Sequence, residues 1–222
     1  MFAIRMNPHR RTFRLLALFT LLATSLVAVD RTGPLVAAGA SDDAKKAVEA
    51  KGYHVALDDG WSADFWFARA LATSPTPYPT AAAGALYPDL ANGEFVGVVT
   101  FTKGASDFRG QAIPAGTYTL RYQYIPQDAN HMGVSPNPDF LLAIPIASDT
   151  APADNLPLKR LAVLSAKSTG TAHPAVFAMA PAGSPSSVTK DDQGMTIFAV
   201  EVPTAAGKTE KISIIVKGQA PQ

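Results

Sequence analysis

Apolar and polar residues alternate most clearly between Thr117 and Tyr124. Every second residue from Tyr118 onward is tyrosine or leucine, and the residues between them, such as Arg121, are polar. A period of two with aromatic and β-branched residues predicts a half-buried β-strand. Pro126 ends this strand, because proline lacks the N–H that a sheet ladder needs.

Similar patterns recur along the chain and predict a set of short strands. The run 140–146 is almost wholly apolar, which is typical of a strand covered on both faces. Two short helices are predicted, over 41–51 with Ser41 or Asp42 as the cap and over 156–167. The other predicted strands are 53–57, 61–69, 93–103, 175–180, 195–202 and 208–216. We therefore expect an all-β fold, a single antiparallel β-sandwich of about eight or nine strands with one or two short helices.

The N-terminus has the composition of an export signal. Four arginines and no acidic residue precede an apolar run from Leu15 to Val29, which is too short for a comfortable membrane span. Small residues at 38–40 fit a cleavage site, so residues 1–40 are predicted to be a signal peptide and 41–222 a single domain. The general secretory route is favoured, although Arg10-Arg11 also resembles a twin-arginine signal. An uncleaved anchor is the alternative.

Charge and cysteine content narrow the class of protein. Without residues 1–40 the chain has 14 Lys and Arg against 17 Asp and Glu, a net charge of −3. No basic stripe suggests nucleic-acid binding. The absence of cysteine excludes thiol catalysis and thiolate metal sites. We expect an exported protein, periplasmic or extracellular, with no membrane span after signal cleavage.

Several motifs together resemble a group of uncharacterised exported bacterial proteins. They are Phe-Arg-Gly-Gln at 108–111, Ile-Pro-Ala-Gly-Thr-Tyr-Thr-Leu-Arg-Tyr at 113–122, Asn-His-Met-Gly-Val at 130–134, Asp-Phe-Leu-Leu at 139–142 and His-Pro at 173–174. This resemblance covers roughly residues 93–180 and implies no established activity. The Pro-Ala-Gly-Thr-Tyr unit is also similar to transthyretin-like and carboxypeptidase-regulatory-like β-sandwich domains, which supports the fold only.

The densest group of polar side chains lies in the loop after the central strand. Asp128, Asn130 and His131 are the predicted ligand-binding residues there, with Arg121 on the strand. The simpler interpretation is that His131 and Asp128 bond the backbone of a long loop. Ser135 is near both in sequence, but no Gly-x-Ser-x-Gly turn presents it as a nucleophile.

A metal site is the alternative prediction for this region. His131, Met132 and His173 could bind copper, and a histidine–carboxylate set could bind zinc. However, the histidines are far apart in sequence, so only the fold could bring them together. Without such a site no cofactor is expected.

Aromatic residues in the predicted strand 61–69 offer a further possibility. Trp61, Phe65 and Phe67 share one face and are predicted to be core, while Trp66 points the other way. We therefore single out Trp66 as the aromatic residue to test for ligand contact. The favoured function is a non-enzymatic protein that binds a small molecule, glycan or envelope protein, or serves as an envelope component.

Overall fold

A seven-stranded antiparallel sheet forms most of the structure, a computed structural model that describes residues 28–79, 82–125, 135 and 137–219. Its strand order is β1-β2-β3-β4-β7-β8-β9, so most strands pair with their neighbours in sequence. The strands are β1 (Ala28–Arg31), β2 (Tyr53–Ala56), β3 (Ser62–Phe67), β4 (Phe95–Phe101), β7 (Gly116–Tyr124), β8 (Asp139–Pro145) and β9 (Ala175–Ala178).

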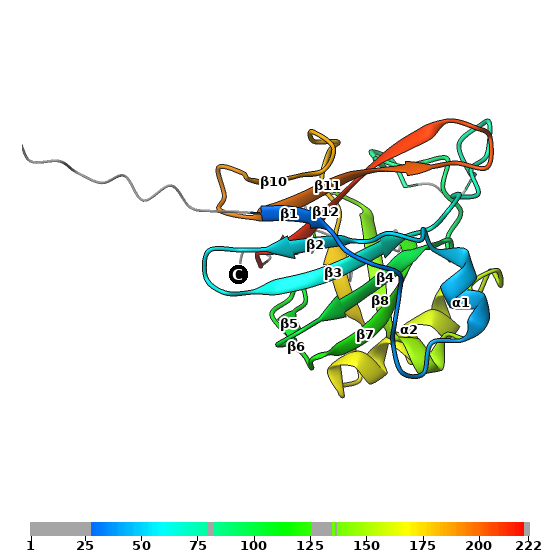
Figure 1. Ribbon diagram of the computed structural model, residues 1–222. Helices are drawn as coiled ribbons and strands as arrows, with labels where there is room; N and C mark the ends of the chain where they lie inside the picture. The colour runs from blue at the N-terminus through cyan, green and yellow to red at the C-terminus, as the bar shows by residue number, and fades with distance from the viewer. Residues whose placement is uncertain (1–27, 80–81, 126–134, 136, 220–222) are drawn as a thin grey trace, which may run out of the picture.

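A three-stranded sheet covers one face of the large sheet, and the two together form a sandwich (Figure 1). It consists of β10 (Ser187–Lys190), β11 (Thr196–Pro203) and β12 (Thr209–Lys217). A short ribbon of β5 (Ala105–Ser106) and β6 (Ala112–Ile113) follows β4. A bridge between Met179 and Ile214 ties the edge of the large sheet to β12. The predicted all-β, antiparallel sandwich is confirmed.

The main core lies between the two sheets. Phe198 of β11 packs against Phe65 and Phe67 of β3, with ring centroids 5.2 and 6.1 Å apart. The alternate residues of β7 that begin with Tyr118 also point into this core, as their period of two predicts. Burial of these rings is the main force that holds the sheets together.

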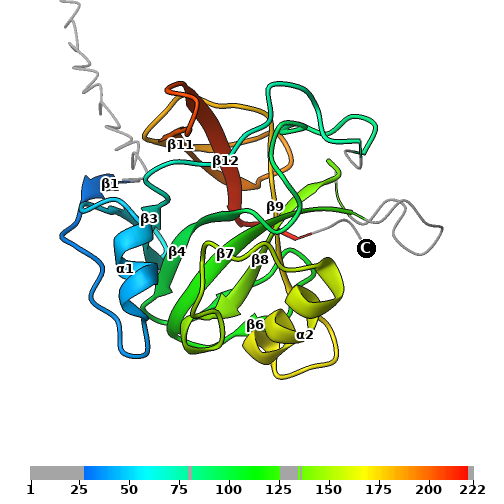
Figure 2. The ribbon, with the colours of Figure 1, turned by 90° about the vertical axis from the view of Figure 1, so that its right-hand side faces the viewer.

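The helices lie on the opposite face of the large sheet (Figure 2). The longer helix, α2 (Leu158–Thr169), packs Leu161 and Leu164 onto the outward side chains of β8. It ends at Gly170, whose φ of 65° is the left-handed geometry that favours glycine. The shorter helix is α1 (Asp42–Ala47), and a 3₁₀ turn, η1 (Ile146–Ser148), follows β8. Both predicted helices are confirmed, and β8 is covered on both faces.

The predicted boundary at residue 40 falls inside the folded structure. β1 pairs with β2 along its full length, and Leu35 is buried. The Trp66 indole donates to the Gly33 carbonyl oxygen at 2.9 Å. Ser41 caps α1, as predicted, by accepting from the Ala44 N–H, so it lies well inside ordered chain rather than at its start. Residues 28–40 therefore belong to the fold.

None of the helices in the described part of the chain has the length and apolar character of a membrane-spanning segment.

Candidate functional site

Most of the loop that follows the predicted strand 117–124 lies outside the described residues. Asp128, Asn130, His131 and Met132 are among these positions, so their predicted ligand or metal roles stay predictions. His173 is described and exposed. Within the described ranges, no group of three or more histidines and acids has a geometry that could hold a metal ion.

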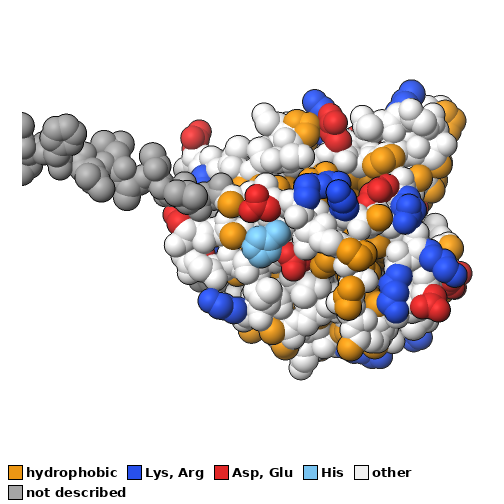
Figure 3. All heavy atoms as spheres, viewed as in Figure 1, with side chains coloured by type: hydrophobic (Ala, Val, Ile, Leu, Met, Phe, Trp, Pro, Cys, Tyr) orange, Lys and Arg blue, Asp and Glu red, His pale blue; other side chains and the backbone are white. Residues whose placement is uncertain are grey.

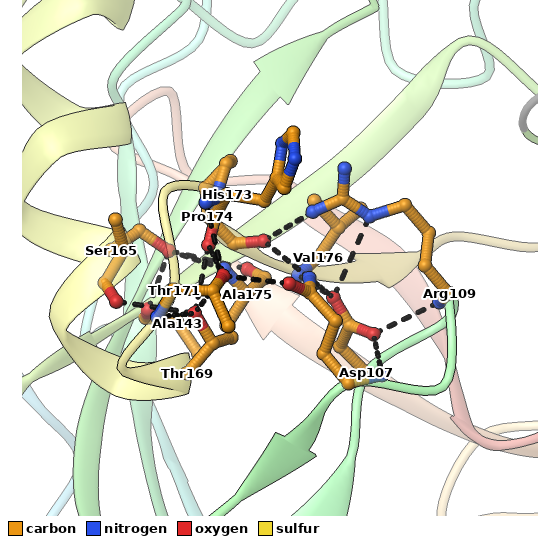
Figure 4. Close-up of polar contacts among 12 residues, drawn as sticks. Asp107, Arg109, Ala143, Ser165, Thr169, Thr171, His173, Pro174, Ala175 and Val176 are labelled. Atoms are coloured by element: carbon orange, nitrogen blue, oxygen red, sulfur yellow. Dashed lines mark hydrogen bonds and ion pairs between the residues drawn. The ribbon is translucent and has the colours of Figure 1, made fainter.

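The segment around His173 is held by its backbone rather than by its ring (Figure 4). The His173 carbonyl oxygen accepts from the Thr169 and Thr171 hydroxyls at 2.8 and 3.2 Å. The imidazole projects away from these bonds in Figure 4. His173 therefore contributes a tight turn after α2, and its ring is free to face solvent.

A buried carboxylate joins this segment to the turn before β6. Asp107 is fully buried and accepts from the backbone N–H groups of Arg109, Gln111 and Val176. The Arg109 guanidinium and the Gln111 amide both donate to the Pro174 carbonyl oxygen. These bonds satisfy loop backbone groups that would otherwise be unpaired. They hold the Phe-Arg-Gly-Gln and His-Pro motifs together in one hydrogen-bonded cluster.

Arg121, predicted to contact a ligand, is instead a fully buried structural residue. Its Nε and Nη2 atoms donate to the two carboxylate oxygens of Asp149, both at 2.8 Å, and Thr119 donates to the same carboxylate. Its remaining bonds go to the carbonyl oxygens of residues 93, 151, 152 and 154. Because its guanidinium is enclosed and saturated, no donor is left for a ligand, and this part of the prediction is wrong.

Trp66 is also unavailable to a ligand. It does lie on the opposite face from Phe65 and Phe67, as the alternation predicts, but it is only 5% exposed. The segment after β1 covers it and accepts its indole N–H at Gly33. The sequence pattern gave the correct face, but it could not show that residues 32–40 lie on top of that face.

Tyrosines and a third buried acid, Asp139, hold the connection between β3 and β4 in place. Asp139 accepts from the backbone N–H groups of Leu86 and Tyr87 at 2.7 and 3.0 Å, and from the Tyr122 hydroxyl at 2.5 Å. Burial raises the pKa of Tyr87 to about 12. Burial and the bond to Asp139 also raise the pKa of Tyr122. These hydroxyls stay protonated and serve as structural donors.

A histidine–aspartate pair lies on the outer surface of the large sheet. His54 and Asp64 are direct cross-strand neighbours, with Nδ1 and Oδ1 2.6 Å apart. Asp30 of β1 is the neighbour of His54 on its other side. The His54 and Asp64 side chains are 39% and 23% exposed, so this is a surface pair rather than an enclosed site.

The structure does contain a cavity at one end of the sandwich, with a volume of about 640 Å³. We call it the end cavity. It is lined by the β2–β3 turn with Trp61, residues 103–106, the ends of β10 and β11, and residues 216–219. The β2–β3 turn and the last residues of β12 lie together at this end of the molecule (Figure 1).

The local sequence explains the part of the end cavity that the β2–β3 turn and Trp61 form. Asp59-Gly60 makes the β2–β3 turn, with Gly60 at a φ of 78° and the Asp59 carboxylate accepting from the Trp61 N–H at 3.0 Å. The turn places Trp61 at the rim of the sheet, where it is half-buried against Phe101. Trp61 was predicted to be core, and it does pack against the core while also lining the cavity.

Comparison with known proteins gives no relative: no protein-family model, curated protein or solved structure matches the chain.

Proposed function

We propose that this protein is an exported, non-enzymatic β-sandwich that binds a ligand in the end cavity. The cavity carries the proposal, because about 640 Å³ is within the usual range for small-molecule sites. The composition of its lining adds support, since Trp61 and Leu57 offer apolar contact and several polar side chains can orient a ligand. Export rests on the arginine-rich, apolar N-terminus.

The other polar clusters favour binding over catalysis. The acids Asp107, Asp139 and Asp149 are buried and bonded mainly to loop backbone, to tyrosine or to arginine. Such groups hold loops in place and are enclosed away from any substrate.

The two tryptophans provide a direct test. Trp66→Phe leaves Trp61 as the only indole, and Trp61→Phe leaves the buried Trp66. We expect a panel of glycans and small metabolites to include a ligand that changes the fluorescence of the Trp66→Phe protein in a saturable way. The same ligand should leave the fluorescence of the Trp61→Phe protein almost unchanged. Full affinity in a Trp61→Ala protein, measured by calorimetry, would contradict binding in this cavity.

A further inference from the structure

Two lysines lie in one row on the wall of the end cavity. The register of the small sheet pairs Lys190 of β10 with Thr196 of β11, and Thr196 with Lys217 of β12. Direct neighbours on one face have Cβ atoms about 5 Å apart. All three residues line the cavity. The sheet therefore presents one ammonium group on each side of Thr196.

Only one of these lysines is neutralised by a carboxylate. Lys217 forms an ion pair with Asp59. Within the described residues Lys190 has no ion pair, and Lys103, which also lines the cavity, has a single long bond of 3.4 Å to the Gly60 carbonyl oxygen. The cavity lining thus holds three lysines, Lys103, Lys190 and Lys217, against two acids, Asp58 and Asp59, of which Asp59 is paired with Lys217. This excess of positive charge favours an anionic ligand.

The rest of the lining suits hydroxyl groups and a flat ring. Asp58 and Gln219 line the cavity with polar atoms that can accept from or donate to hydroxyls, and Ser106 adds a hydroxyl of its own. Trp61 supplies an aromatic surface, on which the apolar face of a sugar ring packs well. A long apolar anion such as a fatty acid would leave these polar groups unpaired, at a cost in free energy.

We propose that the ligand of the end cavity is a sugar acid, a hydroxyl-rich ring with a carboxylate, bound with the carboxylate at Lys190 and Lys103 and the ring against Trp61. This inference rests on the proposed ligand-binding function. A free monosaccharide acid and the end of an acidic polysaccharide present the same chemistry, so both belong in the test.

The test measures affinity by calorimetry for three probes: galacturonate, galacturonate oligomers and neutral galactose oligomers of matched length. We expect an acidic probe to bind at least about tenfold more tightly than the neutral one, and more weakly as salt rises. Tight binding of the monomer would identify a free sugar acid, and a requirement for the oligomer would identify a polysaccharide end. Lys190→Gln should lower the affinity for the acidic probe about tenfold.

Lys211→Gln is the matched control, since Lys211 is an exposed lysine of the same sheet that does not line the cavity. Its affinity should equal that of the unchanged protein. Equal, salt-insensitive binding of acidic and neutral probes would overturn the sugar-acid inference and leave the ligand-binding function intact. The same conclusion would follow if no sugar acid binds but a ligand without a carboxylate binds in a way that depends on Trp61. Failure of every ligand in the panel would overturn both.

Discussion

At the scale of single residues, buried charges organise the loops of this protein. Arg121 and Asp149 are each about 1% exposed and bond almost entirely to one another and to loop carbonyl groups. Arg121 also lies over the Phe95 ring, 5.6 Å from its centroid. A charged pair in such a place is sensitive to loss of one partner, because the other is left buried and unpaired.

We expect Asp149→Ala to lower the free energy of unfolding by about 3–5 kcal/mol, since it leaves the Arg121 guanidinium buried without an anion. Replacing both partners together, as in Arg121→Met with Asp149→Leu, should cost less than the single change. Urea denaturation followed by circular dichroism measures both values. The exposed Lys45–Asp42 pair provides the control: Lys45→Gln should change stability by less than about 1 kcal/mol. Equal effects of Asp149→Ala and Lys45→Gln would show that the buried pair is not a structural anchor.

The buried tyrosines predict instability at alkaline pH. In the unfolded chain a tyrosine ionises near pH 10, whereas the pKa of Tyr87 in the fold is about 12. The unfolded state therefore loses its proton first, so stability is complete below about pH 10 and falls as the pH rises toward 12, by about 1.4 kcal/mol per pH unit for each such group. Urea titrations from about pH 8 to 11 measure this slope. Tyr87→Phe should flatten it, and a slope that is unchanged in this variant would argue against the assignment.

At the scale of elements, the sequence predicted most strands because their side chains follow simple periods. β3, β7 and β12 have apolar residues, mostly aromatic or branched, at every second position, and β8 is apolar after Asp139. The strands that the sequence failed to predict are short: β1, β5, β6 and β10 have two to four residues. Their pairing depends on what lies beside them in space, which a local pattern does not contain.

The end cavity could be predicted only in part, for the same reason. The sequence Asp58-Asp59-Gly60 is typical of a hairpin turn, and a tryptophan directly after such a turn lies at the rim of a sheet, so the sequence did contain a sign for Trp61. Lys190 and Lys217 are 27 positions apart in sequence, and their row follows from the register of β10, β11 and β12. For Arg121, polarity on an alternating strand indicated the outward face, but the 149–155 loop that encloses it has no periodic signal.

Deleting residues 28–40 should destabilise the fold although they precede the predicted cleavage site. A chain that starts at Ser41 loses β1, the buried Leu35 and the Gly33 acceptor of Trp66. We expect it to unfold at a urea concentration clearly below that of a chain starting at Ala28, with a loss of at least about 2 kcal/mol. Equal stability of the two chains would mean that β1 contributes nothing.

The same reasoning predicts where the mature chain would begin if the proposed export signal is cleaved. Because residues 28–40 belong to the fold, the mature N-terminus should lie at or before Ala28. Mass spectrometry of the protein recovered after export measures this directly. An N-terminus at Ser41 in a stable, exported protein would contradict it.

At the scale of the whole molecule, the two sheets share one core. The largest cluster of buried residues includes members of the large sheet, such as Phe65 and Leu141, and of the small sheet, such as Phe198 and Ile212. No cysteine is present to crosslink them. On the face seen in Figure 3, charges of both signs are interspersed with apolar side chains rather than gathered into one large patch.

A shared core predicts one cooperative unfolding transition. Fluorescence from the large sheet, which holds Trp66, and circular dichroism from all strands should give coincident curves. Phe198→Ala, in the small sheet, should lower stability by about 3–5 kcal/mol and shift both curves together. Separate transitions for the two signals would show that the sheets fold independently.

The pairing of β1 has one more consequence, for solubility. Without β1 the large sheet would end at β2, whose residues include Tyr53 and Val55 and whose outer N–H and C=O groups would be unpaired. An open edge of this kind is a template for the strands of another molecule. β1 closes that edge with only four residues, and exposed Asp30 and Arg31 make the new edge short and charged. The first strand of the described structure thus prevents the large sheet of one molecule from pairing edge to edge with that of another.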